Sequence, residues 1–81
     1  GMAHTFTIRA EWDAASACWV AAADDVPGLV TGADTFEDLI EKLKVLIPEL
    51  LELNGVLPIE EARRAPFRVI AERHEPARAV A

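Results

Sequence analysis

Between residues 36 and 51 the apolar side chains recur every three or four positions, which is the spacing of one face of an α-helix. The stripe consists of Phe36, Leu39, Ile40, Leu43, Leu46, Ile47, Leu50 and Leu51. A helix with one apolar face has to bury that face against another element. A chain of 81 residues has room for one such core, and a domain of this size buries only about 60 % of its unfolded surface.

Both ends of this helix carry start and stop signals. Thr35 lies three residues before Asp38, the spacing of a capping box with Asp in place of the usual Glu or Gln, so the helix is predicted to begin after Thr35. Gly55 suits the left-handed position that ends a helix. Pro48 lies inside the stripe and has no backbone N–H to donate, so it is predicted to kink the helix or to restart it.

The complementary apolar surface is predicted to come from β-strands. Residues 4–12 alternate between apolar and polar side chains, as in a strand with one covered face. The apolar positions are Phe6, Ile8, Ala10 and Trp12. Residues 18–23 are apolar on both faces, which is typical of a strand covered on both sides or of one whose second face meets a partner. A short strand over 29–33 and a last strand over 66–75 complete the set.

The connections between these strands predict the topology. Residues 13–17 form a predicted hairpin loop, and Pro27 and Gly28 stand in the order that tight turns favour. Three consecutive strands favour an antiparallel meander, and a helix before the last strand favours a crossover that lays this strand beside an earlier one. The predicted fold is α+β, in the order β-β-β-α-β, with one long helix on a four-stranded mixed sheet. One helical turn is predicted in the connector at residues 60–64.

The domain is predicted to span residues 3–75, followed by a flexible tail over 76–81. Gly1 is interpreted as a residue left from expression cloning. No apolar run approaches the roughly 20 residues that cross a bilayer, so no membrane insertion is predicted. The single cysteine, Cys18, cannot form an intrachain disulfide and is compatible with a reducing cytoplasm.

Two stretches carry a family resemblance. Residues 25–31 read Asp-Val-Pro-Gly-Leu-Val-Thr, and residues 34–40 read Asp-Thr-Phe-Glu-Asp-Leu-Ile at the helix start. In this order they resemble the HicB antitoxin family, and more closely a branch of short bacterial HicB-like proteins of undefined function. The resemblance runs over residues 6–57 and, more loosely, over residues 67–72.

The resemblance implies a partial ribonuclease H-like fold and a non-enzymatic role in the cytoplasm, with no cofactor. HicB proteins bind and neutralise HicA toxins, which are small basic proteins that cleave messenger RNA. Many members also carry a C-terminal DNA-binding domain. The stretch after Pro76 is too short for a helix-turn-helix or ribbon-helix-helix unit, so we expect no direct nucleic-acid binding by this chain alone.

The charge distribution suits a small basic partner. The net charge is −6, and residues 11–61 hold twelve carboxylates against two lysines, whereas residues 62–81 hold five arginines against two glutamates. An acidic body repels nucleic acid and attracts basic proteins, although such a surface can also serve solubility alone. The candidate partner-binding residues are Asp24, Asp25, Glu37, Asp38 and Glu41, with Trp19 as a candidate apolar anchor.

These candidates have structural alternatives. Asp24 and Asp25 can accept hydrogen bonds from local backbone amides, and Trp12 and Trp19 can pack in the core. The alternative function is a stand-alone oligomeric scaffold or a small-molecule sensor without a toxin. Because no second helix is available for the far side of the sheet, that face or a sheet edge is predicted to be closed by self-association, most simply as a two-fold dimer.

No catalytic or metal site is predicted. A ribonuclease H-like nuclease needs carboxylates converging on two cations about 3.5–4 Å apart. The nearest candidates are Glu11, Asp38 and Glu72, but Asp38 is expected in the helix cap and the two glutamates on a solvated strand face. His4 and His74 lack metal-ligand spacing and are expected on the surface.

Overall fold

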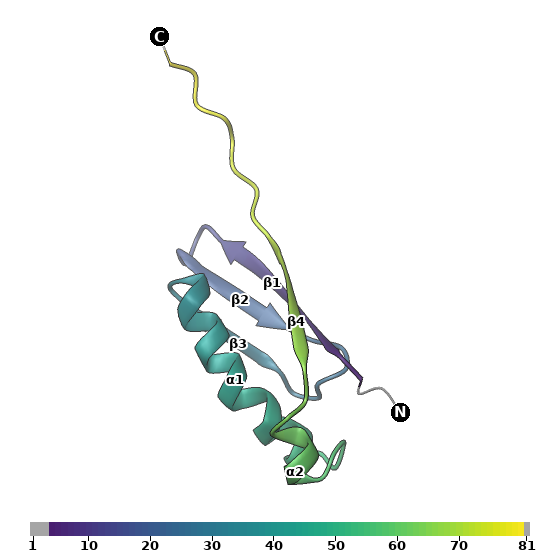
Figure 1. The fold of residues 1–81 in the computed structure, drawn as a ribbon. Coiled ribbons are helices and arrows are strands. Elements are labelled where there is room, and N and C mark those ends of the chain that lie inside the picture. The colour runs from purple at the N-terminus through teal and green to yellow at the C-terminus, as the bar shows by residue number, and fades with distance from the viewer. Residues whose placement is uncertain (1–3, 81) are drawn as a thin grey trace.

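The computed structural model describes residues 4–80, which form a four-stranded sheet and one long helix packed on it (Figure 1). The elements are β1 (Phe6–Asp13), β2 (Cys18–Ala22), β3 (Val30–Ala33), α1 (Phe36–Leu53), α2 (Ile59–Ala62) and β4 (Phe67–Glu72). This α+β fold has the predicted order, and α2 is the helical turn expected in the connector. The interpretation of Gly1, and the predicted outer limits at residues 3 and 81, lie outside the described residues.

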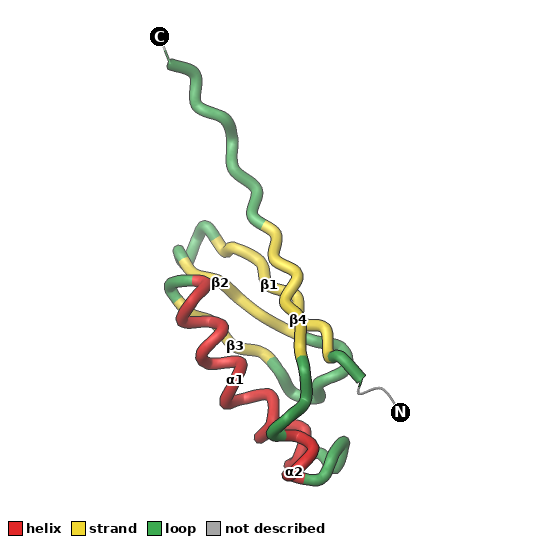
Figure 2. The backbone as a smooth tube through the Cα atoms, in the orientation of Figure 1, coloured by secondary structure: helices red, strands yellow, loops and turns green. Residues whose placement is uncertain are grey.

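The strands lie in the order β3-β2-β1-β4 across the sheet (Figure 2). β1 pairs with β2 and β2 with β3 in antiparallel fashion, while β4 runs parallel to β1. The meander and the crossover are therefore confirmed. β4 ends at Glu72 rather than at residue 75, because its ladder with β1 stops at the pair of Glu11 and Glu72. Beyond it the Arg73 guanidinium lies over the Trp12 ring, 4.0 Å from the ring centroid.

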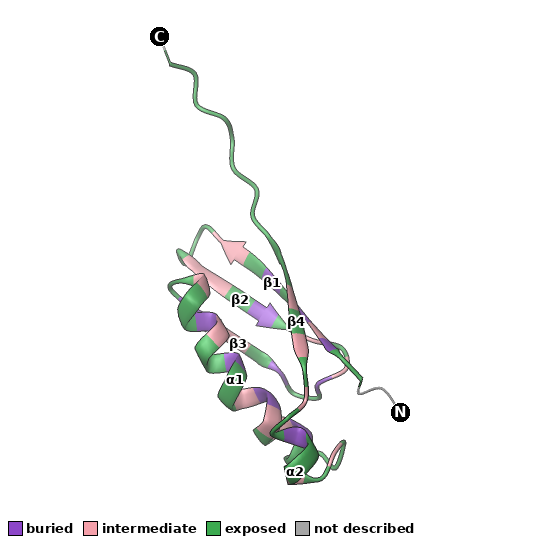
Figure 3. Ribbon diagram, in the orientation of Figure 1, coloured by how far each residue is buried: buried purple, intermediate pink, exposed green. Residues whose placement is uncertain are grey.

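The core lies between the sheet and α1, where the buried residues of Figure 3 gather. The helix contributes Leu39, Leu43, Ile47 and Leu51, and the sheet contributes Phe6, Ile8, Ala10, Ala21 and Ala33. The alternation predicted for the first strand is confirmed, because the side chains of Phe6, Ile8 and Ala10 face the helix and are at most 4 % exposed. Each large side chain buried in this way contributes roughly 1.5–3 kcal/mol to folding.

The ends of α1 are where the sequence places them. The Thr35 hydroxyl oxygen accepts a hydrogen bond from the backbone N–H of Asp38 at 3.1 Å, so the predicted N-cap is confirmed. Gly55 has a φ of 67°, and the backbone N–H of Val56 donates to the carbonyl oxygen of Leu51 at 2.9 Å. This is the hydrogen bond of a Schellman motif, in which a glycine takes the left-handed position after the helix.

Pro48 lies in the interior of α1. The helix is a single element from Phe36 to Leu53, so it does not restart at the proline. A proline in a helix interior costs about 3 kcal/mol. Its neighbours Ile47 and Leu51 are at most 1 % exposed, and their burial offsets that cost because each contributes roughly 1.5–3 kcal/mol.

The predicted turn between β2 and β3 is anchored in the core. The backbone N–H of Leu29 donates to the carbonyl oxygen of Val26 at 3.2 Å, and both side chains are at most 2 % exposed. Gly28 has a φ of 79°, as the third residue of a type II turn requires. The side-chain amide of Asn54 donates to the carbonyl oxygen of Pro27 at 3.3 Å, which ties the turn to the end of α1.

The sheet face opposite α1 is open to solvent within residues 4–80. Val20 on β2, Val30 on β3 and Ile70 on β4 are 37 %, 73 % and 43 % exposed. The second face of β2, predicted to be covered or to meet a partner, is thus uncovered in the single chain. Neither helix of the described part combines the length and the apolar character that a bilayer crossing requires.

Candidate functional site

The outward face of α1 carries an acidic stripe with an apolar centre. Five residues at three- and four-residue spacing compose it, and all are exposed; we call them the α1 stripe: Asp38, Glu41, Val45, Glu49 and Glu52. Val45, in the middle, is 60 % exposed. Two carboxylates lie on each side of the exposed valine along the helix, and together they form a surface suited to a cationic partner.

A shallow groove runs beside this stripe, between α1 and β3. Its lining consists of Thr31, Glu41, Lys42, Val45, Leu46 and Glu49. The lining thus combines two apolar side chains and two carboxylates with one lysine and one threonine. Lysine and arginine side chains have apolar stems and charged heads, so they match this combination.

The lysines of α1 do not neutralise the stripe strongly. Lys42 donates a hydrogen bond to the carbonyl oxygen of Gly32, so its ammonium group is drawn toward β3. Lys44 pairs with Glu41 at 3.1 Å, but both side chains are more than half exposed. An exposed pair of this kind contributes about 0–1 kcal/mol and gives way readily to a competing partner.

The predicted acidic residues fall into two separate groups. Glu37, Asp38 and Glu41 lie in the first two turns of α1. Asp24 and Asp25 lie in the loop after β2, which contacts the opposite end of the helix. A helix of 18 residues is about 27 Å long at about 1.5 Å per residue, so the structure does not bring the five acids together.

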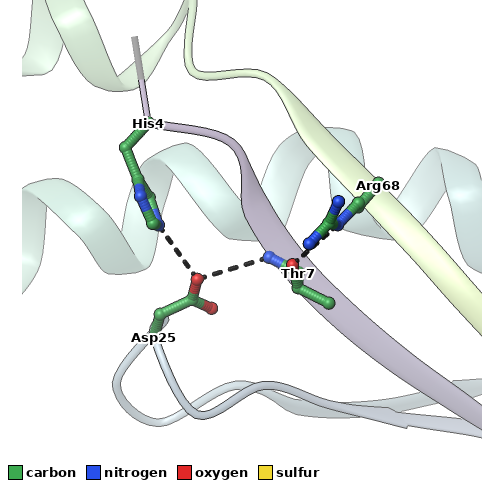
Figure 4. Close-up of polar contacts among 4 residues, drawn as sticks. All are labelled: His4, Thr7, Asp25 and Arg68. Atoms are coloured by element: carbon green, nitrogen blue, oxygen red, sulfur yellow. Dashed lines mark hydrogen bonds and ion pairs between the residues drawn. The ribbon is translucent and has the colours of Figure 1, made fainter.

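Asp25 connects its loop to the sheet (Figure 4). Its Oδ2 atom accepts a hydrogen bond from the backbone N–H of Thr7 at 3.3 Å and lies 3.1 Å from Nε2 of His4. The Thr7 hydroxyl oxygen in turn accepts from Nε of Arg68 at 2.9 Å, which extends the network to β4. Asp25 therefore bonds a backbone amide, as in the structural alternative, although the amide belongs to β1 and is not local. Asp24, beside it, is exposed.

Trp19 packs at the rim of the core. Its ring centroid lies 5.4 Å from that of Phe36 and 5.6 Å from that of Trp12, in edge-to-face geometry. The side chain is half-buried and contacts the buried cluster. Trp19 therefore packs as the core-packing alternative predicts, and it is not among the residues that line the groove beside the α1 stripe.

The three acids considered for a nuclease site do not converge on one point. Glu11 and Glu72 are neighbours on the open sheet face, whereas Asp38 lies at the start of α1 on the other side. Within residues 4–80, no three His, Cys, Asp or Glu side chains are arranged to hold a metal ion. His74 is exposed with Nε2 3.4 Å from Glu72, and Cys18 is half-buried at the start of β2.

Two members of the α1 stripe, Glu49 and Glu52, were not among the predicted binding residues. The helical spacing that predicts the buried face also assigns both glutamates to the outward face, so the signal is present in the sequence.

Comparison with known proteins gives a family without an assigned activity. Residues 5–81 match the model of a domain of unknown function, DUF1902. The crystal structure of hypothetical protein TTHA1013 from the extremely thermophilic bacterium Thermus thermophilus is similar, with 43 % sequence identity and a TM-score of 0.68. The similarity covers 94 % of this chain and 100 % of that one. No curated protein matches significantly. The chain belongs to the DUF1902 family.

Proposed function

We propose that this chain is a non-enzymatic, antitoxin-like binding module that acts in the cytoplasm and masks a small basic toxin of the HicA type. The exposed α1 stripe, with the groove beside it, is the observation that carries the proposal. The resemblance of the Pro27–Gly28 turn and the Thr35 helix start to HicB antitoxins supports the choice of partner.

The proposed mechanism is steric masking aided by electrostatic attraction. A protein that cleaves RNA has to bind the phosphate backbone, and it does so with lysine and arginine side chains. The four carboxylates of the α1 stripe present the same sign of charge as those phosphates. Complementary charge accelerates encounter and orients the two proteins, while apolar contact with Val45 and Leu46 slows dissociation. With α1 on the basic surface of the toxin, RNA is excluded from it.

Growth rescue tests this function. A HicA-type toxin is expressed alone and then together with the chain. We expect the toxin to arrest growth and the chain to restore it. The double variant Glu41→Lys and Glu49→Lys is expected to lose rescue, because it replaces both carboxylates of the groove with cations.

A matched control separates this surface from overall charge. Glu60→Lys and Glu61→Lys together make the same change in net charge on exposed residues of α2, away from the groove. We expect the control to rescue growth like the unaltered chain. Absence of rescue by the unaltered chain, or equal rescue by both double variants, would overturn the proposal.

A further inference from the structure

The two edges of the sheet differ in how far they are protected. β3 has only four residues, and Lys42 donates a hydrogen bond to the carbonyl oxygen of its Gly32. β4 has six residues, and residues 73–80 continue from it as an exposed, extended arm that runs away from the sheet and helix (Figure 1). A free strand edge presents unpaired N–H and C=O groups to any strand that approaches. β4 is therefore the edge that is open to pairing.

The backbone of β4 offers an uninterrupted set of these groups. The carbonyl oxygen of Pro66 accepts a hydrogen bond from the backbone N–H of Phe6 at 3.0 Å, so Pro66 points toward β1. Alternate residues of a strand point to opposite sides, so the even-numbered residues of β4 face β1 and the odd-numbered ones face outward. The outward set is Phe67, Val69 and Ala71, and each of them has an N–H and a C=O to offer.

The side chains of β4 on the open sheet face are self-complementary. They are Arg68, Ile70 and Glu72, that is, a cation, an apolar residue and an anion at equal spacing. In an antiparallel pair with Ile70 opposite Ile70 of the partner subunit, Arg68 lies opposite Glu72 of the partner subunit, and the reverse pair forms by symmetry. Opposite charges facing each other across two strands stabilise the pairing.

The register follows from the same three residues. Moving the two-fold axis by one residue in either direction places Ile70 opposite a charged side chain, Arg68 or Glu72 of the partner subunit. With the axis at Ile70, the charged pairs occupy non-hydrogen-bonded positions, where the Cα atoms approach to about 4.5 Å and side chains are closest. Val69 then lies opposite Ala71 of the partner subunit, in a hydrogen-bonded position.

We propose that β4 pairs in antiparallel fashion with β4 of a second copy of this chain, about a two-fold axis at Ile70. The result is one continuous sheet through both subunits, with the arm of each chain running toward the partner's α2. Both α1 stripes stay exposed, so this pairing does not depend on the toxin-binding role.

Charge exchange across the axis tests the register. Sedimentation equilibrium of the purified chain at tens of micromolar is expected to give twice the 8.8 kDa mass of one chain. Arg68→Glu alone, and Glu72→Arg alone, each create two like-charge pairs and are expected to raise the dimer Kd about tenfold or more. The two changes together restore opposite charges and are expected to restore the dimer. Lys44→Glu, at an exposed residue of α1 away from β4, is the control and leaves the Kd unchanged.

Disulfide trapping gives a second readout that does not depend on charge. In a Cys18→Ser background, Ile70→Cys places two thiols on the axis at about 4.5 Å between Cα atoms, within the range of a disulfide, so a covalent dimer is expected on mild oxidation. Val30→Cys, on the same face at the other edge and 73 % exposed, is the matched control and should form no covalent dimer.

Three results would overturn the pairing. They are a monomeric mass at tens of micromolar, a charge exchange that fails to restore the dimer, and cross-linking through Val30→Cys instead of Ile70→Cys. All these measurements use the chain alone, so their failure is separate from a failure of toxin neutralisation.

Discussion

The side-chain amide of Asn54 donates a hydrogen bond to the carbonyl oxygen of Pro27 at 3.3 Å, across 27 residues of sequence. The same amide donates to the carbonyl oxygen of Leu50 at 2.9 Å, so it also caps the end of α1. Asn54 thereby joins the helix C-terminus to the turn between β2 and β3. The turn and the helix end, which stand far apart in the sequence, form a single corner of the fold.

Asn54→Asp is expected to destabilise the fold at least as much as Asn54→Ala. Either change removes both side-chain donors, at an expected cost of about 0.5–1.5 kcal/mol per hydrogen bond. The aspartate also adds a negative charge at the negative end of the helix dipole. Urea unfolding of both variants measures this. An aspartate variant as stable as the unaltered chain would show that the amide donors do not hold the corner.

Gly55→Ala is expected to lower the free energy of unfolding by about 1 kcal/mol, because an L-residue is strained at the left-handed φ of 67°. A Cβ at this position meets no atom within 4 Å, so the cost is conformational and not steric. Gly55→Asn is expected to cost less, because asparagine tolerates this conformation. Equal stability of the alanine and glycine forms in urea unfolding would contradict the assignment of the helix end.

Pro48→Ala is expected to stabilise the protein by about 1–3 kcal/mol, since alanine supplies the missing helix hydrogen bond and removes the proline clash. Each kcal/mol raises the Tm of a domain of this size by roughly 4–8 °C, so calorimetry resolves the effect. Leu46→Ala, also on α1 and half-buried, is the opposing control and should lower the Tm. A lower Tm for Pro48→Ala would mean that the proline ring itself makes a packing contact that outweighs its cost.

Local patterns predicted most of the fold because the physics that forms each element acts over a few residues. The alternation of Phe6, Ile8 and Ala10 marks a one-sided strand, and Thr35 and Gly55 mark the helix ends through their own backbone chemistry. The parallel position of β4 followed from a rule on crossovers and not from any residue within it.

The parts that the sequence did not predict depend on distant contacts. Asp25 bonds the backbone of Thr7, which lies 18 residues earlier, and no local pattern encodes that partner. Pro48 remains inside α1 because the neighbouring buried side chains outweigh its helix-breaking cost, a balance that propensity alone does not contain. The five predicted acids were grouped by charge, but the length of α1 separates Asp24 from Glu37.

Titration calorimetry of the chain with a purified HicA-type toxin tests the role of the α1 stripe most directly. We expect the Kd to rise at least about tenfold between low salt and about 0.3 M salt. Added salt shortens the distance over which exposed charges attract each other, so it weakens the attraction between the α1 stripe and the toxin. Glu41→Gln together with Glu49→Gln should weaken binding at low salt and flatten its salt dependence, while Glu60→Gln with Glu61→Gln should change neither. No binding, or binding that is indifferent to both salt and the stripe variant, would contradict the account.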